Sequence, residues 1–206
     1  MTKTKLQKFF DQAEDRDSFF ARVHRFTLPY HEGALLIAKA YETSKNAFRG
    51  VKRKRGERYF EHCRMVAVIL MDIVKVADVD LVIAALLHDV VEDVDGWNLA
   101  RIETEFGPRV SALVGAVTMP AGSFPDRDAR IHAFHEQISN GPDGAWKIKL
   151  ADRLHNLSTA SSLSGEAQRR MIDETRKIYL GRAETANILH RELREVIALR
   201  EKELTQ

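Results

Sequence analysis

The sequence predicts an all-α fold, a bundle of about eight to ten helices formed by 206 residues. Apolar residues recur three and four positions apart along most of the chain, which is the period of a buried helix face. Clusters rich in Gly, Pro, Asp and Asn separate these segments: DVDGWN, FGPR, MPAGSFPD and SNGPDG. No segment sustains the alternation of apolar and polar residues that indicates a strand.

Residues 1–29 are expected to form a polar helical extension, and residues 30–206 the main domain. The extension lacks the apolar stretch and the small-residue cleavage site of a secretory signal. The main domain begins with a helix whose inward face repeats at i, i+3, i+4 and i+7, as shown by Ala34, Ile37, Ala38 and Tyr41.

Two runs that are apolar on all sides indicate central helices, from Met65 to Val76 and from Val79 to Leu87. The segment VAVIL in the first run could by itself be a buried strand, but its length and flanks favour a helix. Helical spacing returns at Val110–Val117, at Ile131–Ile138 and in an amphipathic helix from Leu189 to Arg200. The stretch from about 117 to 127 is expected to be the main irregular loop.

Composition is ordinary for a soluble globular protein, with 44% hydrophobic and 30% charged residues. The formal net charge is only +2, so attraction to polyanions must be local. The longest apolar runs, such as MVAVILM, are too short to cross a bilayer. Cys63 is the only cysteine, which excludes an internal disulfide and favours the reducing cytoplasm.

The segment LLHDVVEDV brings four ionisable groups to the end of a core helix: His88, Asp89, Glu92 and Asp93. Burying charge is costly unless the charge is paired or bound to a metal. If the helix continues past His88, that residue and Glu92 lie one turn apart, as do the two aspartates. A histidine beside the carbonyls of a helix end is unexceptional, but three carboxylates there are disfavoured by the helix dipole. Adjacent His and Asp suit Zn, Mn or Fe, so we favour a functional site.

Two further inward-facing residues could complete a metal site. His62 lies on the apolar face of its helix, where a lone histidine is more often a core residue with a satisfied hydrogen bond. Asp152 also lies on an apolar helix face, which is uncommon for an unpaired carboxylate. The combined set supplies two imidazoles and two carboxylates: His62, His88, Asp89 and Asp152.

Glu92 and Asp93 would then remain beside the metal. A carboxylate in that place could orient or deprotonate a water whose pKa the cation lowers. The alternative for this pair is a solvated loop that opens before DVDG.

A basic run leads directly into His62 and consists of Arg49, Lys52, Arg53, Lys54, Arg55 and Arg58. Such runs are usually solvated faces or nucleic-acid patches. Here the positive charge would stand close to the proposed metal, where it would suit a phosphorylated substrate and the charge that develops in its transition state.

The segments RKRGERYFEH, ALLHDVVED and KLADRLHN together resemble the hydrolase half of the RelA/SpoT homologue family, within the HD-domain metal-dependent phosphohydrolases. The likeness runs in collinear order from about Ala34 to Tyr179 and includes EFGPRVSALVGAVT and ETRKIY. Three ordered motifs are much more specific than the dipeptide HD alone. No synthetase domain follows, so the chain resembles a single-domain small alarmone hydrolase.

This resemblance implies an HD-domain helical bundle with one Mn²⁺ ion held by His62, His88, Asp89 and Asp152. Glu92 and Asp93 match the acidic pair that activates water against the 3′-diphosphate of ppGpp or pppGpp, giving GDP or GTP and pyrophosphate. The substrate-binding positions that it implies are Arg53 and Lys54 near the base and phosphates, Asn156 on the nucleotide, and Tyr179. The implied partner is a guanosine polyphosphate rather than a membrane, and a homo-oligomer stays open.

The chain departs from the family pattern at three positions. Arg58 and Cys63 replace two prolines, and Ser158 replaces the arginine that follows RLHN, which puts the nucleotide preference in question. Related small hydrolases act on other 3′- or 2′-phosphorylated molecules, including NADPH or pyrophosphorylated tRNA ends, and some neutralise a toxic synthetase. A third alternative, a non-catalytic helical module, predicts loss of a metal ligand or of the acidic pair, and this chain retains both.

Overall fold

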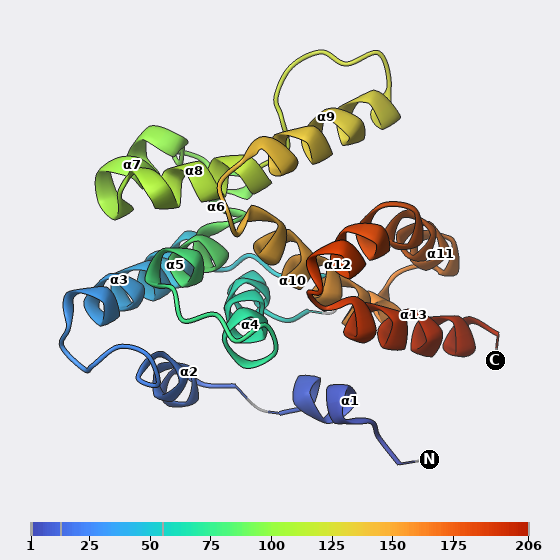
Figure 1. Cartoon of the computed structure of the whole chain (residues 1–206), viewed down its shortest axis with the longest axis horizontal. Coiled ribbons are helices and arrows are strands. Elements are labelled where there is room, and N and C mark those ends of the chain that lie inside the picture. The colour runs from blue at the N-terminus through green and yellow to red at the C-terminus, as the bar shows by residue number, and fades with distance from the viewer. Residues whose placement is uncertain (1, 13, 55, 206) are drawn as a thin grey trace.

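The computed structural model describes residues 2–12, 14–54 and 56–205. The all-α prediction is confirmed, because the regular structure of these residues is helical apart from one isolated antiparallel bridge between Lys52 and Arg58. The helices pack as one bundle (Figure 1). Within the described residues, no helix combines the length and the apolar character that crossing a membrane requires.

The first half of the chain contains α1 (Lys5–Phe10), α2 (Arg16–Val23), α3 (Glu32–Ala47), α4 (Tyr59–Asp72), α5 (Val79–Leu87) and α6 (Val90–Asp93). The second half contains α7 (Leu99–Phe106), α8 (Pro108–Val117), α9 (Arg127–Asn140), α10 (Ala145–Ser158), α11 (Gly165–Glu174), α12 (Leu180–Ala186) and α13 (His190–Leu204). A 3-10 turn, η1 (Ala160–Ser162), follows α10, and a π-helical segment, η2 (Thr175–Tyr179), joins α11 to α12. These thirteen described α-helical segments outnumber the expected eight to ten because several, such as α6 with four residues, are short.

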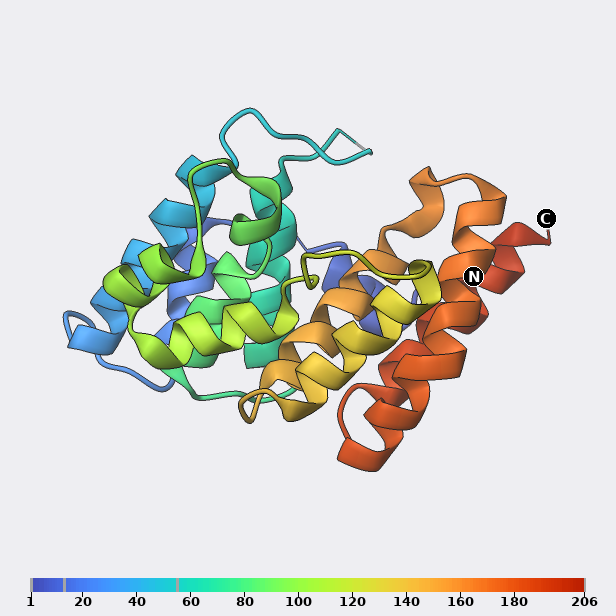
Figure 2. The same ribbon diagram turned by 90° about the horizontal axis from the view of Figure 1, so that it is seen from above.

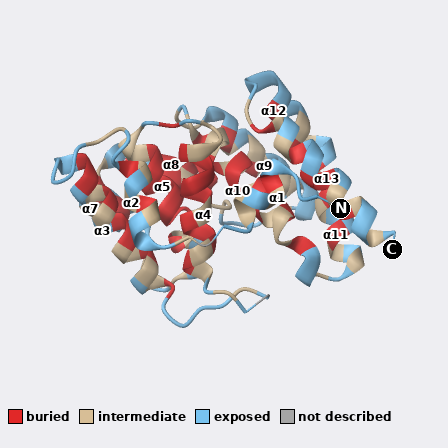
Figure 3. Ribbon diagram, turned by 90° about the horizontal axis from the view of Figure 1, so that it is seen from below, coloured by how far each residue is buried: buried red, intermediate tan, exposed pale blue. Residues whose placement is uncertain are grey.

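The core is built around α4, α5 and α10, which lie at the centre of the bundle (Figures 1 and 3). All side chains of α5 from Leu81 to Leu87 are buried, as its apolar sequence predicts. The helix begins at its predicted residue because the Asp78 carboxylate accepts a hydrogen bond from the Leu81 N–H, 3.2 Å away. The Arg109 guanidinium holds the same carboxylate at 2.6 Å.

The helix predicted from Met65 to Val76 is correct in type, but its end was placed too late. α4 ends at Asp72. Lys75 adopts a left-handed conformation with φ of 64°, and the Val76 N–H turns back to the Leu70 carbonyl at 2.9 Å. This local closure satisfies a terminal carbonyl, which the apolar pattern alone does not reveal.

The remaining helix predictions agree with the structure. The three segments with helical spacing of apolar residues, 34–41, 110–117 and 131–138, lie within α3, α8 and α9. The amphipathic C-terminal segment lies within α13. The main loop occupies residues 118–126, where it was expected, and ends at Asp126, whose carboxylate caps α9 through the Ala129 N–H at 2.7 Å.

The N-terminal segment contributes the helices α1 and α2 and packs into the bundle. Phe19 and Val23 of α2 are fully buried, and the Phe19 ring lies 5.1 Å from the Tyr41 ring of α3. The Arg22 guanidinium joins this segment to α4 by an ion pair of 2.6 Å with Asp72. The residues that precede α3 therefore contribute to the same hydrophobic core as the rest of the chain.

If that contribution matters for stability, Val23→Ala should lower the free energy of unfolding by about 2 kcal/mol, because it removes two buried methyl groups and leaves a cavity. The measurement is denaturant unfolding followed by circular dichroism. Leu28→Ala is the control, since Leu28 is 74% exposed and its loss should change stability by less than about 0.5 kcal/mol. Equal stability of the Val23 variant and the wild type would mean that α2 is dispensable for the fold.

Candidate metal centre

The helix assignment is interrupted at His88 and Asp89, although both residues keep right-handed helical backbone angles. α5 ends at Leu87 and α6 starts at Val90, so the helix does not continue through His88 as one interpretation of the sequence required. The reason is local: His88 Nδ1 lies 2.9 Å from the Ala85 carbonyl, which in a continuous helix would accept the Asp89 N–H. The turn points the other nitrogen of His88 toward the carboxylate of Asp89.

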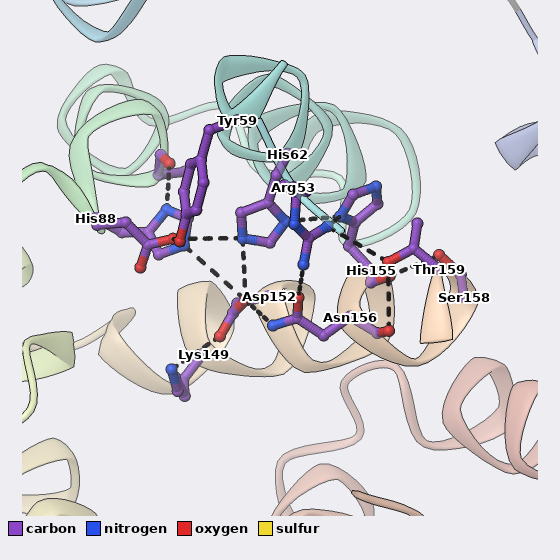
Figure 4. A network of polar contacts seen from close by, with 12 residues as sticks. Arg53, Tyr59, His62, His88, Lys149, Asp152, His155, Asn156, Ser158 and Thr159 are labelled. Atoms are coloured by element: carbon purple, nitrogen blue, oxygen red, sulfur yellow. Dashed lines mark hydrogen bonds and ion pairs between the residues drawn. The ribbon is translucent and has the colours of Figure 1, made fainter. Parts of the chain in front are cut away.

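Four predicted side chains converge at this turn from three helices or their ends, and Figure 4 shows three of them with labels: His62, His88 and Asp152. His62 comes from α4, His88 and Asp89 follow α5, and Asp152 comes from α10. His62 Nε2 lies 3.2 Å from Asp152 Oδ1 and 3.5 Å from Asp89 Oδ2. His88 Nε2 lies 3.1 Å from Asp89 Oδ2 and 3.9 Å from Asp152 Oδ1. The sequence thus identified four residues that the fold brings together.

These donors fit a divalent cation. Ligand bonds of about 2.0–2.2 Å place neighbouring donor atoms roughly 2.8–3.6 Å apart around one ion, close to the distances found here. One ligand atom from each of His62, His88 and Asp89 lies within 4.8 Å of the others. His88 Nε2 is buried without a hydrogen-bond partner in the described structure, which is consistent with a nitrogen that can bind a metal.

The electrostatics of the centre favour added positive charge. Burial opposes protonation of His88, yet the carboxylates of Asp89 and Asp152 raise its pKa to about 9. Burial also opposes ionisation of Asp89, but His88 and His62 hold its pKa below the usual range. Lys149 Nζ lies 2.8 Å from Asp152 Oδ2, so the other oxygen, Oδ1, remains directed at the two imidazoles.

The basic run forms the connection between α3 and α4, which reaches out from the body of the bundle (Figure 2). The Arg53 N–H donates to the Glu57 carbonyl at 2.9 Å, and the bridge between Lys52 and Arg58 closes the hairpin. Arg55 lies outside the described residues. The hairpin leaves Lys54 exposed and turns the half-buried Arg53 toward α10.

Arg53 and Asn156 are tied to the metal centre by hydrogen bonds. The Arg53 guanidinium donates to Asn156 Oδ1 and, at 3.3 Å, to Thr159 Oγ1. Asn156 Nδ2 in turn donates to Asp152 Oδ1 at 2.5 Å. Beside this chain lies a pocket of about 460 Å³ whose lining includes Arg53, Lys54, Tyr59, Asn156, Thr159 and Met171. Three of the four predicted substrate-binding residues therefore share one cavity.

Glu92 and Asp93 lie on α6, at the rim of the centre. Both residues are exposed overall. The Glu92 carboxylate accepts a hydrogen bond from the Met119 N–H of the loop after α8. Partial burial of the carboxyl group raises the pKa of Glu92, and the negative charges of Asp89 and Asp93 act in the same direction.

Tyr179 lies apart from the other predicted site residues. It belongs to η2 and is only 1% exposed. The Arg153 guanidinium covers its ring at 4.0 Å, and its hydroxyl lies 3.4 Å from His135 Nε2. The contacts described for Tyr179 include none with the four converging ligands, so its role in substrate binding stays a prediction.

Three residues around the centre were missed by the sequence-based prediction. Lys149, spaced three residues before Asp152, could have been found from its helical spacing. His155 lies three residues after Asp152 on the same helix face, a spacing that could have indicated it. The Tyr59 hydroxyl donates to Asp89 Oδ2 at 2.9 Å while its ring stacks on Phe48, and no short-range pattern predicts that contact.

Comparisons with known proteins agree with this geometry. Residues 40–123 match the HD domain family. The chain is 35% identical over 158 residues to the bifunctional (p)ppGpp synthase/hydrolase SpoT of Escherichia coli, an alignment that covers 75% of this chain and 22% of that protein. It is 34% identical over 151 residues to the guanosine-3′,5′-bis(diphosphate) 3′-pyrophosphohydrolase of Haemophilus influenzae, covering 71% and 22% of the two chains.

This chain thus spans about a fifth of the length of these curated relatives. A solved structure described as a metazoan ortholog of SpoT that hydrolyses ppGpp superposes with a TM-score of 0.71 at 27% identity. That match covers 84% of this chain and 98% of the other. The resemblance predicted from the three motifs is confirmed.

Proposed function

We propose that this chain, whose residues 40–123 are an HD domain and whose sequence is related to the SpoT-type hydrolases, hydrolyses ppGpp and pppGpp to GDP or GTP and pyrophosphate. The observation that carries the proposal is the convergence of His62, His88, Asp89 and Asp152 beside a pocket lined with basic residues. Such a pocket suits a phosphorylated ligand, and the names of the relatives specify which one.

We propose Mn²⁺ as the ion, because two imidazoles and two carboxylates suit Mn, Zn or Fe and the family resemblance favours Mn. When bound, a divalent ion would polarise a phosphoryl oxygen and make a nearby water more acidic. The protein would hold it through His62 and His88 nitrogens and the carboxylates of Asp89 and Asp152. The Lys149 ammonium would keep one oxygen of Asp152 occupied and the other directed inward.

Glu92 would act as the general base. Its carboxyl group stands at the rim of the centre, where the Met119 N–H fixes it. Its raised pKa makes it a stronger base than an ordinary glutamate, and catalytic carboxylates work best when their pKa approaches the operating pH. Asp93 would assist by adding negative charge beside Glu92.

The nucleotide would bind in the pocket beside the centre, where Lys54 would contact one of its phosphates. Arg53 already donates to Thr159 and Asn156, whereas the exposed Lys54 lines the same pocket. Arg53 therefore connects the pocket to the metal ligands, and Lys54 is the better candidate for direct contact with a substrate phosphate. We expect the enzyme to act in the cytoplasm, in line with its single, free cysteine.

If Lys54 binds a phosphate, Lys54→Ala should raise KM for ppGpp and lower kcat/KM by roughly 10- to 100-fold, the cost of one charge-assisted hydrogen bond. Metal content and kcat should change little. Lys45→Ala on α3, whose ammonium lies 3.5 Å from Glu42, is the matched control and should behave as wild type. An unchanged KM for ppGpp together with weaker tRNA binding would assign the basic hairpin to RNA instead.

A side-by-side assay of Mn²⁺-loaded protein tests the substrate. Equal concentrations of ppGpp, NADPH and pyrophosphorylated tRNA are incubated, and released pyrophosphate and phosphate are measured separately. The proposal expects pyrophosphate from ppGpp as the fastest reaction. Preferential release from either of the other substrates would keep the metal centre and replace the substrate, and no release from any of them would favour a non-catalytic module.

A further inference from the structure

The second imidazole nitrogen of His62, Nδ1, faces another histidine that has no part in the proposed mechanism. His62 Nδ1 lies 2.6 Å from Nδ1 of His155, a residue of α10. Both histidines are buried, with 1% and 8% of their surface exposed. Two imidazole nitrogens at this distance share a single proton, so one ring donates and the other accepts. Which ring donates decides whether His62 can bind a metal.

Arg53 fixes the direction of this hydrogen bond. Its guanidinium can only donate, and Nη1 lies 3.4 Å from His155 Nδ1 (Figure 4). His155 Nδ1 must therefore present a lone pair.

With His155 as acceptor, His62 must donate from Nδ1, and its Nε2 presents a lone pair to the space between Asp89 and Asp152. His88 also presents a lone pair at Nε2, because its Nδ1 donates to the Ala85 carbonyl at 2.9 Å. Ligand histidines generally have their second nitrogen fixed in this way, by a carbonyl, a carboxylate or a water.

We propose that His155, held by Arg53, is a positioning residue that fixes the tautomer and ring orientation of His62 for metal binding. The proposal rests on the metal centre of the proposed function. The N-terminal segment contacts the same pair of histidines. The Phe10 ring of α1 packs against His155, with ring centroids 6.2 Å apart. That contact covers one side of the buried pair of imidazoles.

Two substitutions separate hydrogen bonding from packing. His155→Asn places an amide oxygen near the position of Nδ1 and retains an acceptor, whereas His155→Leu has a similar size and no acceptor. We expect the leucine variant to bind Mn²⁺ about 10- to 100-fold more weakly than wild type, and the asparagine variant to recover most of the affinity. The measurement is titration of metal-free protein with Mn²⁺, with circular dichroism to verify folding.

His132→Asn is the matched control, because the His132 side chain is 76% exposed on α9. A folded leucine variant with wild-type affinity would overturn the proposal. So would an asparagine variant as weak as the leucine variant, because the acceptor would then be irrelevant.

The tautomer itself is measurable in the unaltered protein, which keeps the test decisive if the leucine variant does not fold. Long-range ¹H–¹⁵N spectra of the metal-free wild type, recorded at a pH where the His62 ring is neutral, should place the His62 proton on Nδ1, and a proton on Nε2 would refute the proposal. Neither measurement involves substrate. A protein that binds Mn²⁺ as described but releases no pyrophosphate from ppGpp would therefore contradict the proposed function alone.

Discussion

Replacing His88 with alanine should abolish both metal binding and turnover. His88 contributes a nitrogen that is buried without a hydrogen-bond partner among the described residues, 3.1 Å from Asp89 Oδ2. Removing one of the four proposed ligands would open the coordination sphere and leave the two carboxylates facing each other with less compensation. We expect purified wild-type protein to carry close to one equivalent of Mn²⁺ or a substitute, and the variant to carry almost none.

Metal analysis by inductively coupled plasma mass spectrometry and a pyrophosphate-release assay measure the two effects on the same samples. EDTA should inactivate the wild type and added Mn²⁺ should restore it, whereas the variant should not respond to Mn²⁺. His132→Ala, which removes an exposed histidine, is the control and should keep metal and activity. Full metal occupancy in a folded His88 variant would remove His88 from the ligand set.

The corresponding substitution of Asp152 is also informative, but its effect on metal binding is combined with an effect on stability. Asp152→Ala should also lose the metal, yet it deprives the half-buried Lys149 ammonium of a carboxylate only 2.8 Å away. Breaking a buried ion pair by removing one partner costs about 3–5 kcal/mol of stability. Loss of activity in that variant therefore combines a missing ligand with a destabilised α10, and the His88 variant separates the two.

The helices were predictable because their signal is local. The apolar period and the breakers are properties of neighbouring residues, and they located α5 to the residue. Helix ends were less predictable where a side chain or a turn competes for the last carbonyls. His88 takes the Ala85 carbonyl and ends α5, and the turn at Lys75 ends α4 before its apolar run is complete.

The four converging residues were predictable for a different reason. Asp152 is a carboxylate on an apolar helix face, which is uncommon, whereas His62 by itself was equally consistent with an ordinary core histidine; the two became a candidate site only when combined with His88 and Asp89. The residues that hydrogen-bond around this site could not be identified from the sequence in the same way. His62 and His155 are 93 positions apart, and Arg53 and Asn156 are 103 apart, so only the folded chain shows that they meet. The buried position of Tyr179 was equally inaccessible to motif matching.

Glu92→Gln should lower kcat by roughly 10²- to 10⁴-fold, the range expected when a general base is lost. Glutamine has nearly the same shape but cannot accept a proton from water. Its amide oxygen can still accept the Met119 N–H, so the tether between α6 and the loop after α8 should survive. The contacts described for Glu92 do not include a hydrogen bond to His62, His88, Asp89 or Asp152, so metal content and substrate Kd should change little.

A fall in kcat without a change in metal content or Kd would distinguish Glu92 from the ligands, whose loss removes the metal itself, and from Lys54, whose loss acts through KM. Glu103→Gln on α7 is a suitable control, because Glu103 is an exposed glutamate outside the centre. Normal turnover in Glu92→Gln would show that Glu92 is a structural carboxylate that fixes the loop. The base would then have to be sought at Asp93, the other acidic residue of α6, whose charge already acts on Tyr59 and Glu92.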